Sequence, residues 1–278
     1  MAVRCMRSTE MTRIIDSHCH IYPEKIAHKA VIAIDDFYGG ISGHHHDGTT
    51  ETLIESGKEA GITHFVVHSV ATTPHQVSSI NRFIADAVEN SGGAFTGLGA
   101  LHPESETPEE DFQQILDLGL CGVKLHPDIQ QFQADSTKAF RLYEMIEDSG
   151  IPVLVHAGDS RYDYSNPDRI AHILKSFPRM KLVAAHLGGY SVWEEAVLKL
   201  SDFPNVWVDT SSSFPFLEPQ RAGEIIREFG TDKVMFGTDY PLWVQSPDLE
   251  YMKELNLTEE EEERIYWANC ADLYNMEF

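Results

Sequence analysis

The chain has 278 residues, of which 42% are hydrophobic and 23% are charged. This length is close to the roughly 250 residues of a single α/β barrel, and a chain of this size can bury a core without disulfides or a structural metal. Its 44 acidic and 21 basic residues give a formal net charge of −23, which disfavours binding to nucleic acid or to an anionic membrane surface.

The four cysteines are scattered and form no CxxC pair, so neither a disulfide framework nor a zinc knuckle is predicted. Residues 1–12 contain no apolar leader and are expected to be an extension before the folded domain. No apolar run approaches the roughly 18 residues that span a bilayer. We therefore expect a cytoplasmic protein with a small-molecule substrate and with neither a membrane nor a nucleic-acid partner. The oligomeric state stays open, a homodimer included.

Short runs rich in β-branched residues alternate with helical stretches along the whole chain. The helical stretches are amphipathic, and some have recognisable starts, such as Asn166-Pro167. Eight runs qualify as strands, at 13–20, 64–69, 95–101, 122–126, 153–156, 181–186, 206–209 and 233–239. This alternation predicts parallel strands joined by crossover helices, and eight such units are what a closed barrel needs.

We predict an α/β protein with one domain, a (β/α)8 TIM barrel over residues 13–278. An open, doubly wound sheet is the rival, but the GxGxxG turn typical of that fold does not follow the first predicted strand. The stretch 39–49, rich in Gly, Ser and His, is expected to form a loop over the mouth of the barrel. Residues 258–274 are expected to form a closing helix.

Polar side chains recur at the carboxyl ends of the predicted strands. In chain order these are His18 and His20, His68, His102, Lys124 and His126, His156, His186, Asp209 and Asp239. In a barrel these ends converge on one face, where active sites lie. Because side chains alternate along a strand, His18 and His20 share a face, and Lys124 and His126 do so too.

Imidazole and carboxylate groups are good ligands for zinc and related divalent ions, so this pattern predicts a catalytic metal site. A single strand-end histidine is more often a hydrogen-bonded structural side chain. When each is considered by itself, we assign this structural role to four histidines: His64, His68, His102 and His172. A structural role for each residue taken separately does not explain why most of the predicted strands end in His or Asp.

Three segments resemble motifs of the amidohydrolase superfamily, in its amidohydrolase-2 branch. They are Ile14-Ile-Asp16-Ser-His18-Cys-His20, Val183-Ala-Ala-His186-Leu-Gly188-Gly189 and Met235-Phe-Gly237-Thr238-Asp239-Tyr-Pro241. This branch holds metal-dependent TIM-barrel hydrolases and non-oxidative decarboxylases, among them enzymes like aminocarboxymuconate-semialdehyde decarboxylase. The resemblance runs from Ile14 to about Tyr274.

The resemblance implies a role for each matching residue. His18, His20, His156 and Asp239 match the metal ligands, and the implied cofactor is one divalent ion, zinc or alternatively manganese. His186 matches a histidine that orients or activates the metal-bound water or the substrate. Asp239 matches a ligand that can also move a proton, so Asp239 and His186 are the expected catalytic residues.

The remaining candidates are expected to contact substrate. Lys124 stands where binuclear members carry a carboxylated lysine, but its Gly-Val-Lys-Leu-His-Pro context differs. We therefore expect an unmodified lysine that binds the substrate, together with His126 and Arg161. The segment Gly43-His44-His45-His46-Asp47 is interpreted first as a solvated loop, with a second metal site or a substrate contact as alternatives.

Two catalytic functions and one non-catalytic function compete. A hydrolase would use metal-activated water on an amide, ester or lactone, and a decarboxylase would use the same site to protonate an unsaturated or aromatic acid. The hydrolase is favoured because it is the broader class, and a carboxylate-bearing substrate is expected because Lys124 needs an anion. A non-catalytic binding barrel is disfavoured by the presence of both His186 and Asp239.

Overall fold

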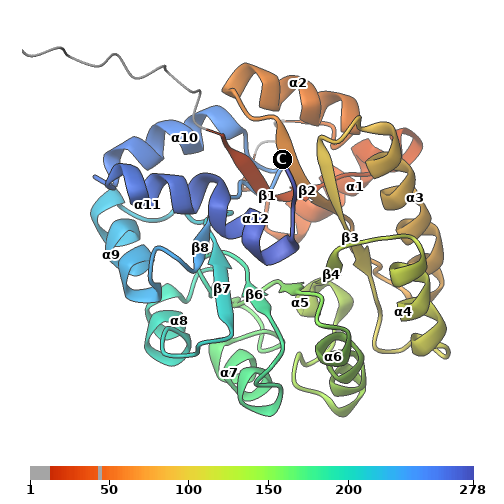
Figure 1. The fold of residues 1–278 in the computed structure, drawn as a ribbon. Helices are drawn as coiled ribbons and strands as arrows, with labels where there is room; N and C mark the ends of the chain where they lie inside the picture. Colours follow the sequence, from red (N-terminus) through yellow and green to blue (C-terminus); the bar gives the residue numbers. More distant parts are fainter. Residues whose placement is uncertain (1–12, 43–45) are drawn as a thin grey trace, which may run out of the picture.

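Eight parallel strands follow one another in chain order around the centre of the molecule, with helices on the outside (Figure 1). The computed structural model describes residues 13–42 and 46–278, so the expected extension 1–12 lies outside the described residues, as do His44 and His45. The strands are β1 (Ile15–His20), β2 (His64–His68), β3 (Phe95–Ala100), β4 (Gly122–Leu125), β5 (Val153–Val155), β6 (Leu182–Ala184), β7 (Val206–Asp209) and β8 (Val234–Met235).

The sheet closes into a barrel because the segment from β8 onward pairs with β1. Ser17 donates its backbone N–H to the carbonyl of Phe236 at 2.9 Å, and Asp239 donates to the carbonyl of His18 at 3.0 Å. The predicted single-domain (β/α)8 TIM barrel is therefore confirmed. The last predicted strand, 233–239, is regular only at Val234–Met235, and the rest follows β1 with irregular backbone.

Helices surround the strands and cover their outer faces. They are α1 (Glu24–Phe37), α2 (Thr50–Ala60), η1 (Pro74–Gln76), α3 (Val77–Asn90), α4 (Pro108–Asp117), α5 (Pro127–Gln130), α6 (Thr137–Ser149), α7 (Pro167–Ser176), α8 (Trp193–Leu200), α9 (Pro219–Phe229), α10 (Gln245–Glu254), α11 (Glu259–Glu263), η2 (Arg264–Ala268) and α12 (Asn269–Tyr274). In the part of the chain thus described, no helix has the length and apolar character needed to cross a membrane.

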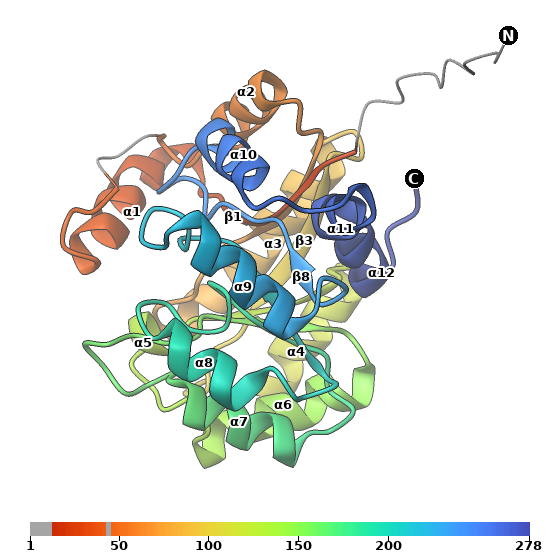
Figure 2. The same ribbon diagram turned by 90° about the vertical axis from the view of Figure 1, so that its left-hand side faces the viewer.

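The two ends of the barrel are covered by different elements (Figure 2). The predicted closing helix at 258–274 consists of α11, α12 and a π-helical turn between them. Cys270, Leu273 and Tyr274 of α12 pack against inward-facing strand residues such as Ile15 and Val66. Helix α1 lies at the opposite end, where the carboxyl ends of the strands open. The apolar side chains of α12 close one end of the barrel, so the polar side chains at the carboxyl ends of the strands are the ones available for chemistry.

A buried carboxylate ties the first strand to the last. The Asp16 side chain is fully buried and accepts bonds from the Thr238 hydroxyl at 2.6 Å and the Thr238 N–H at 3.0 Å. Burial raises the pKa of Asp16 to about 6, although these bonds oppose the shift. A second side-chain bridge, from the Thr210 hydroxyl to the Gly237 carbonyl, joins β7 to the same segment.

We expect Thr238→Val to destabilise the barrel by roughly 1–3 kcal/mol, because it leaves the buried Asp16 carboxylate without a hydroxyl donor at unchanged volume. Urea unfolding followed by circular dichroism measures the change. Thr63→Val is the matched control, since Thr63 is exposed and its hydroxyl contacts only the neighbouring His64 ring. Equal stability of both variants and the wild type would contradict this role of the Asp16–Thr238 bridge.

Candidate metal centre and active site

The strand ends bring most of the predicted polar residues into one buried cluster. His18 and His20 lie on β1 with ring centroids 5.4 Å apart. The Oδ1 atom of Asp239 lies 3.4 Å from Nε2 of His18 and 3.3 Å from Nε2 of His20. Two imidazoles and a carboxylate thus converge, as the period of two along β1 led us to expect.

The tautomer of His18 follows from its neighbours. Its Nδ1 atom lies 2.9 Å from Oδ2 of Asp209 and 3.0 Å from the hydroxyl of Ser211, which itself donates to Asp209. Burial lowers the pKa of His18 to about 4, so the ring is neutral near pH 7. The pKa of Asp209 is below its usual range because the neighbouring imidazole and the Ser211 hydroxyl outweigh the effect of burial. The carboxylate therefore holds the proton on Nδ1 and leaves Nε2 with a free lone pair.

His156 and His186 face each other across a short nitrogen–nitrogen contact. Nδ1 of His186 lies 3.0 Å from the carbonyl oxygen of Ser211 and 2.8 Å from its hydroxyl, and Nε2 of His156 lies 3.1 Å from the carbonyl oxygen of Gly158. Nδ1 of His156 and Nε2 of His186 lie 2.9 Å apart, which is a hydrogen bond when one of the two carries a proton. A cation could take the place of that proton.

Lys124 is buried within the same cluster. Its side chain is 1% exposed, and its Nζ lies 3.1 Å from Nε2 of His18. Burial lowers the pKa of this lysine to about 8, against the opposing effect of Asp239 and Asp209. The ammonium form still predominates at pH 7. The ammonium therefore donates to Nε2 of His18, the nitrogen that would bind a metal, so a bound ion would displace this hydrogen bond.

Tyr38 is a site residue that the sequence did not reveal. Its hydroxyl lies 3.0 Å from Nε2 of His126 and 3.5 Å from Nδ1 of His156. Nδ1 of His126 accepts the N–H of Ile129, so its Nε2 carries the proton and donates to Tyr38. Tyr38 follows α1 rather than a strand, and no motif marks it. Only the general expectation of a loop over the mouth pointed to this part of the chain.

A narrow cleft, too small in this conformation to hold a water molecule, borders the cluster at the carboxyl ends of the strands. Asp239 is fixed in its wall because its Oδ2 accepts the Ser212 hydroxyl at 2.6 Å, and Ser212 in turn accepts Nε1–H of Trp243 at 2.8 Å. The lining residues are Tyr38, Ile41, His156, His186, Tyr190, Ser212, Asp239 and Leu242.

Arg161 lies at the rim of the site rather than inside it. Its guanidinium forms an ion pair with Asp159 at 2.7 Å and donates to the backbone carbonyl of Phe37. The same guanidinium lies 5.0 Å from the ring centroid of Tyr38. In this arrangement Arg161 holds the end of α1 over the cleft, and its expected contact with substrate stays a prediction.

The histidines given a structural role divide into two groups. Nδ1 of His102 accepts the N–H of Glu104, and His172 pairs with Asp135, as expected of structural side chains. His68 departs from that role, because neither of its ring nitrogens has a hydrogen-bond partner among the described residues. His46 lies with its ring 5.3 Å from that of Tyr240.

Comparisons with known proteins find relatives of this chain. The decarboxylase orsB of Emericella nidulans is 27% identical over 153 residues, which are 44% of this chain and 45% of that relative. The chain thus matches less than half the length of this relative. The γ-resorcylate decarboxylase of a Polaromonas species is 21% identical over 255 residues, 70% of this chain and 75% of the relative.

Solved structures share the fold at low sequence identity. An uncharacterised TIM-barrel protein from Bordetella bronchiseptica superposes with a TM-score of 0.78 at 22% identity, over 95% of this chain and 98% of that one. A dihydroxybenzoic acid decarboxylase from Polaromonas, with bound manganese and the inhibitor 2-nitroresorcinol, gives 0.72 at 16% identity, over 95% and 97%. The model of the amidohydrolase family, in its amidohydrolase-2 branch, matches residues 15–276, and the chain belongs to this family.

Proposed function

We propose that the protein is a divalent-metal-dependent decarboxylase of a small aromatic acid. The observation that carries the proposal is the buried Lys124 ammonium beside the imidazoles and Asp239, an arrangement that favours a substrate with a carboxylate. Both curated relatives are decarboxylases, which supports the alternative drawn from the sequence over the hydrolase preferred there. A structure of the same fold carries manganese, so manganese joins zinc as a candidate ion.

The residues present fit a divalent cation. His18 offers a lone pair at Nε2, and a cation could replace the proton shared between Nδ1 of His156 and Nε2 of His186, which lie 2.9 Å apart. His18, His20 and Asp239 would hold the ion, with His156 as the next ligand. When bound, the ion would polarise the carboxylate or a ring oxygen of the acid.

The chain's own groups would bind the acid and move one proton. The Lys124 ammonium would pair with the substrate carboxylate as a point charge. The pKa of Asp239 is well below its usual range because the imidazoles of His18, His20 and His186 outweigh the effect of burial. Asp239 must therefore first accept a proton from the incoming substrate. It then gives that proton to the ring carbon that bears the carboxylate, the carbon–carboxylate bond breaks, its electrons return to the ring, and carbon dioxide leaves.

We expect Asp209→Asn to weaken metal binding by roughly 10–100-fold, the usual effect of losing an outer-shell carboxylate. The amide can donate to Nδ1 of His18, which moves the ring proton to Nε2 and removes the lone pair. Competition with a chromogenic chelator measures the affinity. Asp248→Asn, which changes another buried carboxyl group, is the control and should bind metal as the wild type does. Unchanged affinity in Asp209→Asn would disprove this tautomer argument.

We expect the metal-loaded enzyme to release carbon dioxide from 2,6-dihydroxybenzoate or a related hydroxybenzoate, and chelation to abolish the release. Asp239→Asn should lower the rate by roughly 10²-fold or more, because it removes the proton-transfer group. Carbon dioxide release and loss of substrate absorbance are the readouts. Hydrolysis of 2-pyrone-4,6-dicarboxylate without any decarboxylation would favour the hydrolase instead. If Asp239→Asn retains its metal and reacts at a near-normal rate, Asp239 is not the proton-transfer group and His186 becomes the candidate.

We expect Lys124→Ala to keep one metal per chain and to raise KM more than it lowers kcat, the signature of lost ground-state binding. Lys138→Ala removes an exposed lysine that pairs only with Glu104, and it should leave both constants unchanged. Metal analysis and steady-state kinetics test both variants. Two ions per chain in the wild type, falling to one or none in Lys124→Ala, would instead identify a carboxylated lysine bridging two metals.

A further inference from the structure

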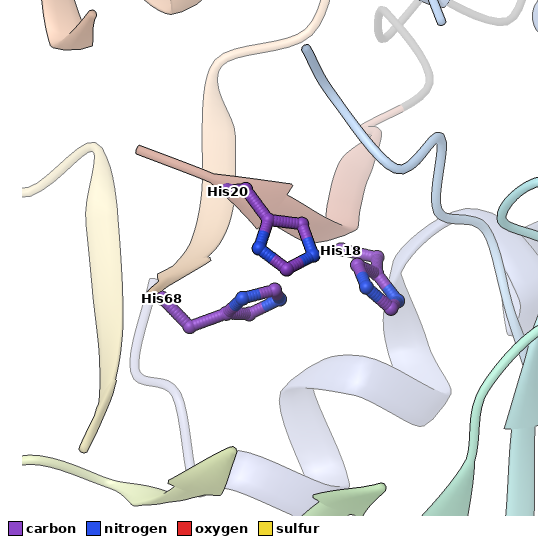
Figure 3. Close-up of side chains that lie close together, drawn as sticks. All are labelled: His18, His20 and His68. Atoms are coloured by element: carbon purple, nitrogen blue, oxygen red, sulfur yellow. The ribbon is translucent and has the colours of Figure 1, made fainter. Parts of the chain in front are cut away.

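His68 is a third histidine of the metal cluster that the family motifs do not mark. It ends β2, directly in register with His20 on β1, so both side chains point into the barrel mouth. The ring centroid of His68 lies 4.4 Å from that of His20 and 4.8 Å from that of His18, edge-on to both. Figure 3 shows the three rings gathered around a common point.

The surroundings of His68 satisfy neither of its ring nitrogens. The side chain is fully buried, and within residues 13–42 and 46–278 neither Nδ1 nor Nε2 has a hydrogen-bond partner. A buried polar group left without a partner is destabilising, and such groups are rare in folded proteins. His102, also buried, lies two residues after the end of β3, and its Nδ1 accepts the N–H of Glu104. Burial at a strand end thus does not by itself produce an unpaired ring.

The spacing of the three rings fits a common ligand. One nitrogen from each of His18, His20 and His68 can be chosen so that all three atoms lie within 4.8 Å of one another. Side-chain rotation can bring nitrogens at this spacing onto a single ion bound at about 2.0–2.1 Å. His20 contributes a further unpaired atom, because its Nδ1 is also buried without a partner in the described chain. The unpaired nitrogens thus occur together, at one place.

We propose that His68 is a ligand of the same divalent cation as His18 and His20, so that β1 and β2 together supply three imidazoles opposite Asp239. The inference rests on the proposed metal centre and adds a ligand from a strand to which the family motifs assign none. A shell rich in imidazole favours zinc and related transition-metal ions over magnesium or calcium, which prefer oxygen ligands.

Metal binding tests the proposal without reference to turnover. Wild type, His68→Gln and His102→Gln are titrated with Mn²⁺, and the electron paramagnetic resonance signal of the free aqua ion gives the dissociation constant. We expect His68→Gln to weaken binding at least as much as loss of an outer-shell partner does, roughly 10–100-fold. His102→Gln, the matched control, should bind as the wild type does.

A second variant distinguishes loss of a metal ligand from misfolding of the chain. His68→Leu removes the unpaired polar atoms, so the metal-free variant should be at least as stable in urea as the metal-free wild type, while losing the stabilisation that added metal gives the wild type. If wild type and His68→Gln bind Mn²⁺ equally, the proposed ligand is wrong and the metal centre itself stands. If the wild type binds no divalent ion at all, the proposed function fails together with this inference.

Discussion

The junction between the first and last strands is the constraint on which the site depends. His18 and His20 stand on β1, and Asp239 stands on the segment after β8, so the cluster exists only if the barrel closes there. The two segments approach so closely that a Cβ atom at Gly237 would lie 2.9 Å from Oγ of Ser17. Glycine at position 237 and the buried hydrogen bonds from Thr238 to Asp16 therefore both allow the segment after β8 to lie against β1. The first and the last of the family motifs thus meet in one contact.

Irregular backbone after two strands positions His186 and Asp239, the proposed catalytic groups. His186 and Asp239 both have positive φ, at 62° and 68°, in a region that side chains with a Cβ atom rarely adopt. Conformations of this kind cost on the order of 1–3 kcal/mol each and persist only where the surroundings determine them. Here the N–H of His186 donates to Asp209, and the N–H of Asp239 donates to the carbonyl of His18. The strands therefore stop short of both residues, which explains why β6 and β8 are shorter than predicted.

The fold could be predicted because strand period, strand number and strand-end chemistry are local properties of the sequence. The same logic located Lys124, His156, His186 and Asp239, since each stands at or just beyond the end of a strand. It could not find Tyr38, which follows α1 and lies against His126 beside the point where Arg161 donates to the carbonyl of Phe37. It also assigned His68 a structural role, because the absence of hydrogen-bond partners is a property of the folded neighbourhood and not of the residue type.

The charge balance of the cluster links the metal to the choice of substrate. Burial lowers the pKa of His18 to about 4, so this ring is neutral near pH 7, whereas Lys124 is a buried cation 3.1 Å from it. Under the proposed function, a divalent cation held by His18, His20 and Asp239 would lie close to the Lys124 ammonium, and the two positive charges would repel each other. An anionic group between them would remove this repulsion at a site without access to water, where an unpaired charge is costly. A substrate carboxylate would supply that anion and a neutral ester or amide would not, so the position of Lys124 favours an acid.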